Sequence, residues 1–192
     1  MVRWPSLIVA VTVSVYWGRV LWMAARSRRR TGQSANFLPA EKLGRALRIV
    51  WIPVIGAWIA LPWVYALRTG NYPPWQWIGA GVVVLAFAMT WVCWKKMGTA
   101  WRMGIDPAER GRLLVSGPWA WSRHPIYALS TLMMLGTVAA NPTAPMAAVA
   151  VLHLALLQWE ASREEKYLAQ QHGDEYRNYR ARVGRFIPRW HG

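Results

Sequence analysis

Two segments of the chain carry most of the side chains that could bind a ligand or take part in a reaction. The first, "GRLLVSGPWAWSRHPIY", runs from Gly111 to Tyr127 and places an Arg-His pair among prolines and aromatic residues. The second, "WEASREEKYLAQQHGDEYRNYRARVGRFIP", runs from Trp159 to Pro188 and has two adjacent glutamates near its start. An apolar stretch separates them, so their relation in space depends on how that stretch folds.

The first segment predicts a chain break followed by a new helix. Gly117-Pro118 interrupts the chain, and Pro125 is a residue type favoured in the first turn of a helix. The amino end of such a helix presents free backbone N–H groups and a partial positive charge, which suit an anionic group. Arg123 adds a fixed cation at the same place.

Both segments together offer the groups that one ligand would need. Glu164 and Glu165 can accept hydrogen bonds from hydroxyl or ammonium groups, and Trp119, Trp121 and Tyr127 offer flat surfaces for an aromatic ring. A ligand with a carboxylate, an ammonium, a ribose and an adenine would use all of these features. S-adenosylmethionine has all four.

Each of these residues also has a structural explanation. Arg123 can anchor the chain by reaching lipid phosphates, and His124 can cap the helix. Glu164 and Glu165 can form a solvated helical face. His153 stands alone in an apolar stretch and is expected to be packed and hydrogen-bonded inside the protein. The combination at both ends of one apolar stretch is what favours a ligand site.

The elements that must position these residues are membrane-spanning helices. Five apolar stretches occur, at residues 4–25, 47–67, 75–94, 125–140 and 143–159. The first corresponds to about 33 Å of helix, enough to cross a bilayer. The last two are short and separated only by Asn141-Pro142, a turn signal, so they predict a tight helical hairpin. Pro53 and Pro62 predict kinks in the second helix.

The basic residues predict the orientation. Residues 26–48, 95–123 and 161–192 carry 7, 6 and 7 Lys and Arg, or 20 of the 23 in the chain. Such residues concentrate on the cytosolic side, so we expect the amino terminus outside and the carboxy terminus in the cytosol. The first apolar stretch is too long for a cleaved signal peptide, and "RSRRR" follows it, so we expect an uncleaved anchor.

Composition excludes several other classes of protein. A net charge of +15 would indicate nucleic acid in a soluble protein, but here the cations lie between apolar runs and indicate a basic membrane surface. The single cysteine, Cys93, cannot form an intramolecular disulfide. The chain has no CxxC, HExxH, P-loop or GxGxxG pattern, so neither a metal site nor a classical nucleotide site is expected.

The two segments resemble a known family of membrane enzymes. "LLVSGPWAWSRHPIY", Asn141-Pro142 and "EEKYLAQQHGDEYRNYRARVGRFIP" are similar to isoprenylcysteine carboxyl methyltransferases, whose wider group includes phospholipid N-methyltransferases. The resemblance covers roughly residues 95–188, and the first two apolar stretches match only in hydropathy.

The resemblance implies an all-α integral membrane protein that transfers methyl groups from S-adenosylmethionine. A carboxy-terminal helical segment would close a cofactor pocket open to the cytosol, and a lipid or prenylated substrate would enter from the bilayer. Residues 1–94 would form three spans with a basic cytosolic loop. Residues 95–192 would form the methyltransferase core, made of a connector, the hairpin 125–159 and a cytosolic helix.

The resemblance also assigns cofactor contacts by matching positions. They fall on Trp119, His124, Pro125, Ile126, Tyr127 and Glu164 and, where the loop length departs from the family pattern, on Leu113, Leu114 and Asp106.

Two positions depart from the family pattern. Leu129 stands where many members have glycine, which predicts a reshaped pocket wall. Glu160 stands where isoprenylcysteine enzymes have an arginine that is thought to hold the substrate carboxylate. A glutamate would repel that carboxylate, although Arg163 is near enough in sequence to supply a cation. Glu160, Arg163 and Arg123 are therefore the candidate catalytic residues.

A glutamate at position 160 is compatible with two classes of methyl acceptor. Methyl transfer from a sulfonium is an in-line displacement that mainly requires alignment and exclusion of water. A carboxylate needs no base, whereas an amine or hydroxyl would need one, for which Glu160 or His124 is a candidate. We expect carboxyl O-methylation, with phospholipid amine N-methylation as the alternative.

Two other classes share part of the pattern. NADPH-dependent membrane sterol and enone reductases also have an Arg-His-Pro-x-Tyr turn, but they tend to carry an acidic residue after it and Arg-Asp-Glu before the last helix. Here the corresponding letters are "ALSTL" and "REE", which favours methyl transfer. A non-enzymatic scaffold would have no cavity between residues 119–127 and 160–168. The short chain with few loops favours a bacterial inner membrane, with the active site on the cytosolic side.

Overall fold

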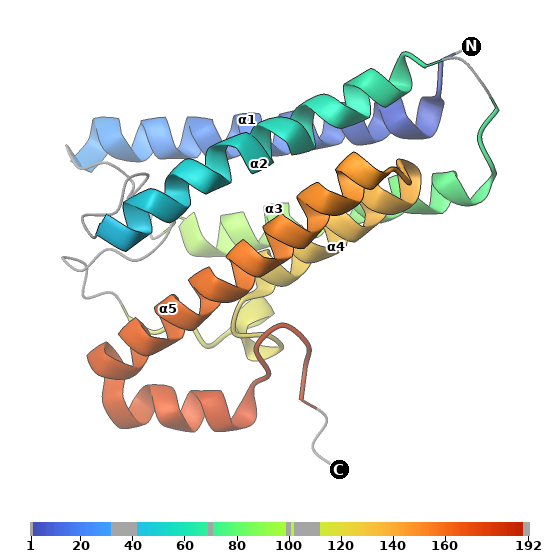
Figure 1. The fold of residues 1–192 in the computed structure, drawn as a ribbon. Helices are drawn as coiled ribbons and strands as arrows, with labels where there is room; N and C mark the ends of the chain where they lie inside the picture. The colour runs from blue at the N-terminus through green and yellow to red at the C-terminus, as the bar shows by residue number, and fades with distance from the viewer. Residues whose placement is uncertain (1, 32–41, 69–70, 99–100, 102–111, 190–192) are drawn as a thin grey trace.

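The computed structural model describes residues 2–31, 42–68, 71–98, 101 and 112–189. Within these ranges the chain is helical and has no β-strand (Figure 1). The elements in order are α1 (Trp4–Thr31), α2 (Lys42–Ala66), α3 (Trp75–Met97), the short 3-10 helix η2 (Gly117–Ala120), α4 (Pro125–Ala140) and α5 (Ala144–Arg182).

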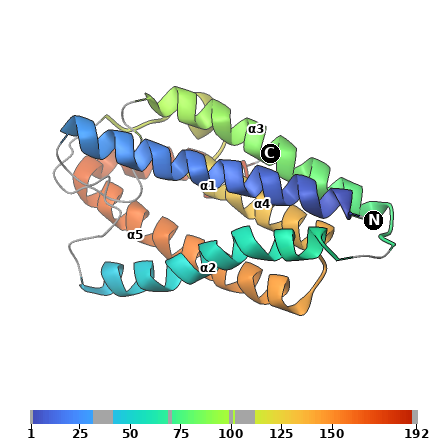
Figure 2. The ribbon, with the colours of Figure 1, turned by 90° about the horizontal axis from the view of Figure 1, so that it is seen from above.

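The predicted class, an all-α membrane protein with about five apolar helices, is confirmed. Helices α1, α2, α3 and α5 are long and apolar enough to cross a bilayer, and α4 is a shorter apolar helix of 16 residues. The carboxy-terminal ends of α1 and α3 lie at the same end of the bundle as the amino-terminal end of α2 (Figures 1 and 2). The described ends of the first two basic segments therefore lie at one end of the bundle, as the alternating spans predict.

The predicted hairpin is present, and α4 begins and ends where the sequence indicates. Asn141 ends α4, and its backbone N–H and side-chain amide both donate to the Thr137 carbonyl, at 2.9 and 3.1 Å. The Thr143 hydroxyl accepts a hydrogen bond from the Met146 amide at 3.3 Å and caps α5. These local bonds satisfy backbone groups on both sides of the turn.

Helix α5 joins the expected fifth span and the expected tail helix into one element. It runs from Ala144 to Arg182 and bends at Gly173, which has a φ of +53° (Figure 1). Residues 146–172 contain no proline or glycine, so nothing in the sequence ends the helix where the apolar run ends. The glutamates after residue 159 are therefore held on the same helix as the membrane span.

Helices α3 and α4 pack with their backbones in close contact. A Cβ atom added at Gly79 would lie 2.6 Å from the Ala140 nitrogen and 2.7 Å from the Gly136 oxygen. A Cβ at Gly136 would lie 2.9 Å from the Gly79 oxygen. Small residues that allow such approach are typical of helix interfaces in membranes. This contact joins the first turns of α3 to the last turns of α4.

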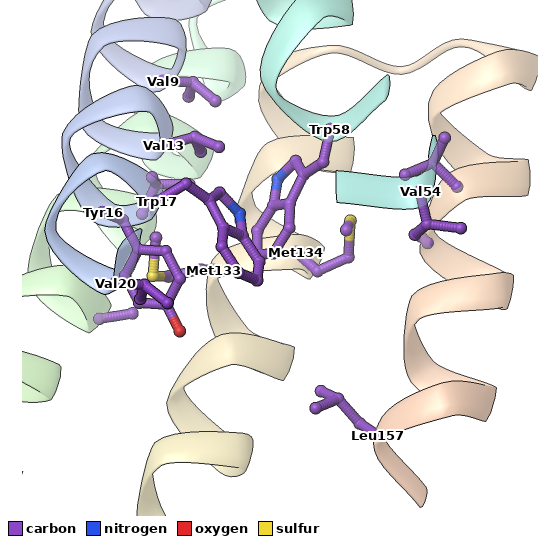
Figure 3. Packing of buried hydrophobic residues seen from close by; sticks show 14 of the residues in the cluster. Val9, Val13, Tyr16, Trp17, Val20, Val54, Trp58, Met133, Met134 and Leu157 are labelled. Atoms are coloured by element: carbon purple, nitrogen blue, oxygen red, sulfur yellow. The ribbon is translucent and has the colours of Figure 1, made fainter. Parts of the chain in front are cut away.

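The core lies between helices α1, α2, α3, α4 and α5 and is rich in aromatic rings. The rings of Trp17 and Trp58 come together over Met133 and Met134 (Figure 3). The Trp58 indole N–H donates to the Thr137 hydroxyl at 3.1 Å. These contacts connect α1 and α2 to α4, which begins at the polar turn.

We expect Gly79→Ala to destabilise the protein by about 1–3 kcal/mol, because the new methyl group would overlap the α4 backbone. Thermal unfolding of the purified protein in detergent measures the change. Gly81→Ala is the matched control on the same helix, since a Cβ there meets nothing within 4 Å. Equal unfolding temperatures for the two variants would contradict the close α3–α4 contact.

Candidate functional site

The two polar segments meet at a buried ion pair. The Arg123 guanidinium contacts Glu165 Oε1 through Nη2 at 2.7 Å and through Nε at 3.0 Å. Arg185, after the end of α5, contacts Glu165 Oε2 at 2.6 Å. Arg123 Nη1 also donates to the Val183 carbonyl. We call Arg123, Glu165 and Arg185 the clasp.

Backbone hydrogen bonds reinforce the clasp. The Arg123 amide donates to the Gly184 carbonyl at 2.9 Å, and the His124 amide donates to the Arg185 carbonyl at 3.0 Å. The Ser122 hydroxyl donates to the same Arg185 carbonyl at 2.9 Å. The expected meeting of the two segments is therefore confirmed. The amides of residues 123 and 124 are engaged by the carboxy-terminal segment, so they are not the free anion-binding groups that the helix start suggests.

The clasp changes the interpretation of Arg123. Its side chain is 6% exposed and its charge is balanced by Glu165, so it does not reach outward to lipid phosphates. It borders the cavity described below, but the contacts it makes hold the turn against α5. We describe Arg123 as a positioning residue. Its place among the candidate catalytic residues stays a prediction.

His124 lies between two carboxylates. Its Nδ1 is 3.5 Å from Glu164 Oε2, and its Nε2 is 3.3 Å from Glu165 Oε1. The ring stacks parallel to Tyr127, with centroids 5.3 Å apart, and does not cap α4. Burial lowers the pKa of His124, but hydrogen bonding to Glu164 and Glu165 and their charges outweigh burial and raise the pKa above 6.5. The geometry therefore favours an imidazolium over a free base.

A cavity of about 450 Å³ lies between the two segments. Eight of the nine residues that the family resemblance assigns to the cofactor line it, namely Leu113, Leu114, Trp119, His124, Pro125, Ile126, Tyr127 and Glu164. The ninth, Asp106, lies outside the described residues. Trp121 is 70% exposed and is not part of the lining, and neither is Leu129. The prediction of the scaffold hypothesis, that no cavity exists here, is wrong.

Glu160 lies on the cavity wall and is held between two arginines. Arg48 Nη2 contacts Glu160 Oε1 at 3.3 Å, and Arg163 Nη1 contacts Glu160 Oε2 at 3.3 Å. Arg48 lines the cavity, whereas Arg163 does not and packs its guanidinium 4.8 Å from the Trp159 ring. Glu160 is thus neutralised, and the cluster of three side chains has a net charge of +1. The two arginines offset the charge of Glu160, and the expected repulsion of a carboxylate by Glu160 stays a prediction.

Arg48 is the functional candidate that the sequence did not reveal. It is 4% exposed and comes from α2, and its buried Nε atom has no hydrogen-bond partner in the part of the chain that the structure describes. In the sequence it is one of several cations before an apolar run, which is also the pattern of an interfacial anchor. Only its burial and its contact with Glu160 distinguish it from the others.

A polar pair lies at the membrane side of the cavity. The Ser130 hydroxyl, which lines the cavity, is 3.1 Å from His153 Nε2 on α5. His153 is fully buried and packs against the Trp58 ring, with centroids 4.6 Å apart. The prediction that His153 is packed and hydrogen-bonded inside the protein is confirmed.

The apolar helices fit a multi-pass membrane protein, and the described residues enclose a cavity that both polar segments border. Residues 75–175, just over half of the chain, match the phospholipid methyltransferase family. The chain therefore belongs to this family, which is part of the isoprenylcysteine and phospholipid membrane methyltransferase group named by the sequence resemblance.

Two relatives are similar over most of the chain. The nickel-cobalt-cadmium resistance protein NccN of Alcaligenes xylosoxydans xylosoxydans is 29% identical over 157 residues, which are 80% of this chain and 68% of NccN. The cobalt-zinc-cadmium resistance protein CzcN of Cupriavidus metallidurans is 28% identical over 138 residues, which are 70% of this chain and 63% of CzcN. The chain thus spans about two thirds of each relative. No solved structure matches significantly.

Loss of the negative charge of Glu165 should destabilise the contact between the two polar segments. We expect Glu165→Gln to lower the free energy of unfolding by about 3–5 kcal/mol, because it leaves the buried Arg123 cation unpaired. Thermal unfolding and limited proteolysis after Arg180 and Arg182 measure the effect. Glu175→Gln, at a side chain that is 67% exposed, is the matched control. A variant that resists protease as well as the wild type does would contradict the clasp.

Protonation of His124 should stabilise the fold. Because its folded pKa is raised above the ordinary 6.5, this stabilisation is complete below pH 6.5 and is lost as the pH rises through the folded pKa. NMR of labelled histidine should resolve a ring that titrates above pH 6.5, and Glu164→Gln should move it toward the ordinary value. Lys166→Gln, an exposed neighbour, serves as the control. Titration below pH 6.5 in the wild type would contradict the two-carboxylate environment.

Proposed function

We propose that this protein transfers a methyl group from S-adenosylmethionine to a substrate dissolved in the membrane. The observation that carries this proposal is the cavity between the turn before α4 and the membrane-proximal turns of α5. Both segments of the family pattern border this cavity, and membership of the phospholipid methyltransferase family supports methyl transfer as the reaction class.

The cavity lining suits the charges of the cofactor. Glu164 offers a carboxylate to hydroxyl or ammonium donors, and Trp119 and Tyr127 offer aromatic surface to adenine or to a sulfonium cation. The first turn of α4, at Ile126 and Tyr127, contributes backbone amides that have no partner within the helix. When bound, the cofactor supplies an electrophilic methyl group on a positively charged sulfur.

The cluster around Glu160 supports an anionic methyl acceptor. Arg48 and Arg163 together exceed the charge of Glu160 by one, and the buried Nε of Arg48 has no partner among the described residues. A substrate carboxylate would satisfy this donor in a way that an ammonium group would not. We therefore propose O-methylation of a lipid carboxylate, as in the isoprenylcysteine enzymes, with Arg48 orienting the carboxylate.

This assignment gives each residue a limited task. A carboxylate is ionised at neutral pH, so no residue would have to remove a proton before its oxygen bonds to the methyl carbon and the bond from that carbon to the sulfur of the cofactor breaks. Arg48 would hold the acceptor in line, and Glu160 would hold Arg48. The apolar wall formed by Trp17, Trp51 and Leu157 would exclude water and accommodate the lipid chain.

Methylation of a phospholipid amine is the second candidate. The family description favours it, and the carboxylates of Glu160 and Glu164 both border the cavity. In that reaction the amine must lose a proton, and Glu160 would have to release its arginine partners to accept it. The distribution of Lys and Arg supports a cytosolic location for the site.

The experiment that tests the proposal is a methyl-transfer assay on the full chain in lipid nanodiscs. The substrates are prenylcysteine acids, phosphatidylethanolamine and isoprenoid alcohols, with methyl-labelled S-adenosylmethionine as donor. Binding of S-adenosylmethionine and of NADPH is measured separately. We expect binding of the former and labelling of a carboxyl substrate. Binding of NADPH alone would replace methyl transfer with the reductase hypothesis.

Two variants separate the acceptor classes. Arg48→Gln should lower kcat/KM for a carboxyl substrate by about 30-fold or more while S-adenosylmethionine still binds, because one partner of a buried charge contact is lost. Arg45→Gln, an exposed cation on the preceding turn of α2, is the control. If phosphatidylethanolamine is the labelled substrate and Glu160→Gln abolishes turnover without loss of cofactor binding, the amine assignment is correct instead.

A further inference from the structure

A second cavity lies outside the site described above, between the carboxy-terminal parts of α1 and α3. Its volume is about 550 Å³. The charged residues in its lining are all cations, namely Arg19 and Arg26 from α1 and Lys95 from α3. None of the three forms an ion pair with an acidic side chain in the part of the chain that the structure describes.

Indole rings hold the two guanidinium groups in place. The Arg19 guanidinium lies 4.1 Å from the Trp22 ring centroid and 5.0 Å from that of Trp91, and the Arg26 guanidinium lies 5.0 Å from Trp22. Such contacts use the face of the guanidinium and leave its N–H donors, which point outward in the plane, for other partners. The Nε atom of Arg19 is buried and has no hydrogen-bond partner among the described residues.

Helix-end electrostatics explain only part of this arrangement. Lys95 belongs to the last turn of α3, where a cation is favoured by the helix dipole. Arg19 is 12 residues before the end of α1, within the span Trp4–Arg29, where a cation is costly without an anionic partner. An anion bound at this cluster would therefore balance a positive charge that lies within the membrane span.

We propose that this second cavity binds the phosphate of an anionic membrane lipid. The cations supply the charge-assisted hydrogen bonds that a phosphate oxygen prefers, and arginine presents its donors as a planar fork. Trp22 and Trp91 are 46% and 38% exposed, as expected for rings at the level of lipid headgroups. A lipid, rather than a soluble phosphate, fits because the cavity is bordered by two membrane-spanning helices.

The second cavity shares two residues with the first. Trp94 and Trp101 line both cavities and are themselves buried. A lipid bound at Arg19 would thus rest against the wall of the proposed methyltransferase site. The lipid site itself does not depend on which reaction the first cavity performs.

The test is native mass spectrometry of the full chain in detergent with added dioleoyl phosphatidylglycerol or dioleoyl phosphatidylcholine. The wild type should retain phosphatidylglycerol in preference. The double variant R19Q/K95Q should bind it about tenfold or more weakly, because it removes two cations that line the cavity and would contact the phosphate directly. The control R28Q/R29Q removes two exposed cations of α1 that do not line the cavity and should change the affinity less than about twofold.

Further measurements distinguish the remaining outcomes. Lys95→Gln alone alters an exposed side chain, so it should fold normally and still weaken phosphatidylglycerol binding by about fivefold. Inorganic phosphate should not displace the lipid, and displacement would identify a soluble phosphate ligand instead. Equal retention of the two lipids, or equal losses in R19Q/K95Q and R28Q/R29Q, would overturn the proposal.

Discussion

The buried contact between Arg123 and Glu165 is the interaction on which the site depends. Taking both charges out of water is costly, so the pair persists only because further groups complete its hydrogen bonding. Arg185 supplies the second oxygen of Glu165 with a donor, and the carbonyls near the end of α5 satisfy the rest of Arg123. These partners come from the segment before α4 and from the distal part of α5 and the residues after it. The cavity wall that both segments form therefore depends on their contact.

The continuity of α5 turns this contact into a defined cavity. Glu160 and Glu164 are four residues apart on one helix, so both face the cavity, while Glu165 faces the clasp. A flexible joint after the membrane span would uncouple Glu160 from the clasp. The bend at Gly173 instead falls beyond these residues and brings the end of the helix back toward η2, where the Tyr179 hydroxyl donates to the Trp119 carbonyl at 2.6 Å.

Each cavity is lined by an arginine whose buried Nε has no hydrogen-bond partner among the described residues. These are Arg48 in the first cavity and Arg19 in the second. The proposed ligands are anionic in both cases, a substrate carboxylate and a lipid phosphate. Trp94 and Trp101 separate the two, so both proposed sites would share one aromatic wall.

The sequence by itself determined the elements whose signals are local. Pro125 and Asn141-Pro142 define α4 residue for residue, because proline and turn residues act on the backbone next to them. Residues 146–172 contain no proline or glycine, so the sequence also indicated that α5 is one continuous helix. The change from apolar to charged residues along this stretch suggested two elements instead. The motif resemblance selected eight residues that border one cavity.

Only the tertiary structure decided which charges meet. Arg48 contacts Glu160 across 112 positions of sequence, and Arg123 contacts Glu165 across 42. Trp119 and Trp121 are equivalent by type, yet one lines the cavity and the other is exposed. The physical reason is that an ion pair or a buried ring depends on the packing of distant helices, whereas each side chain carries the same charge or apolar surface in every fold.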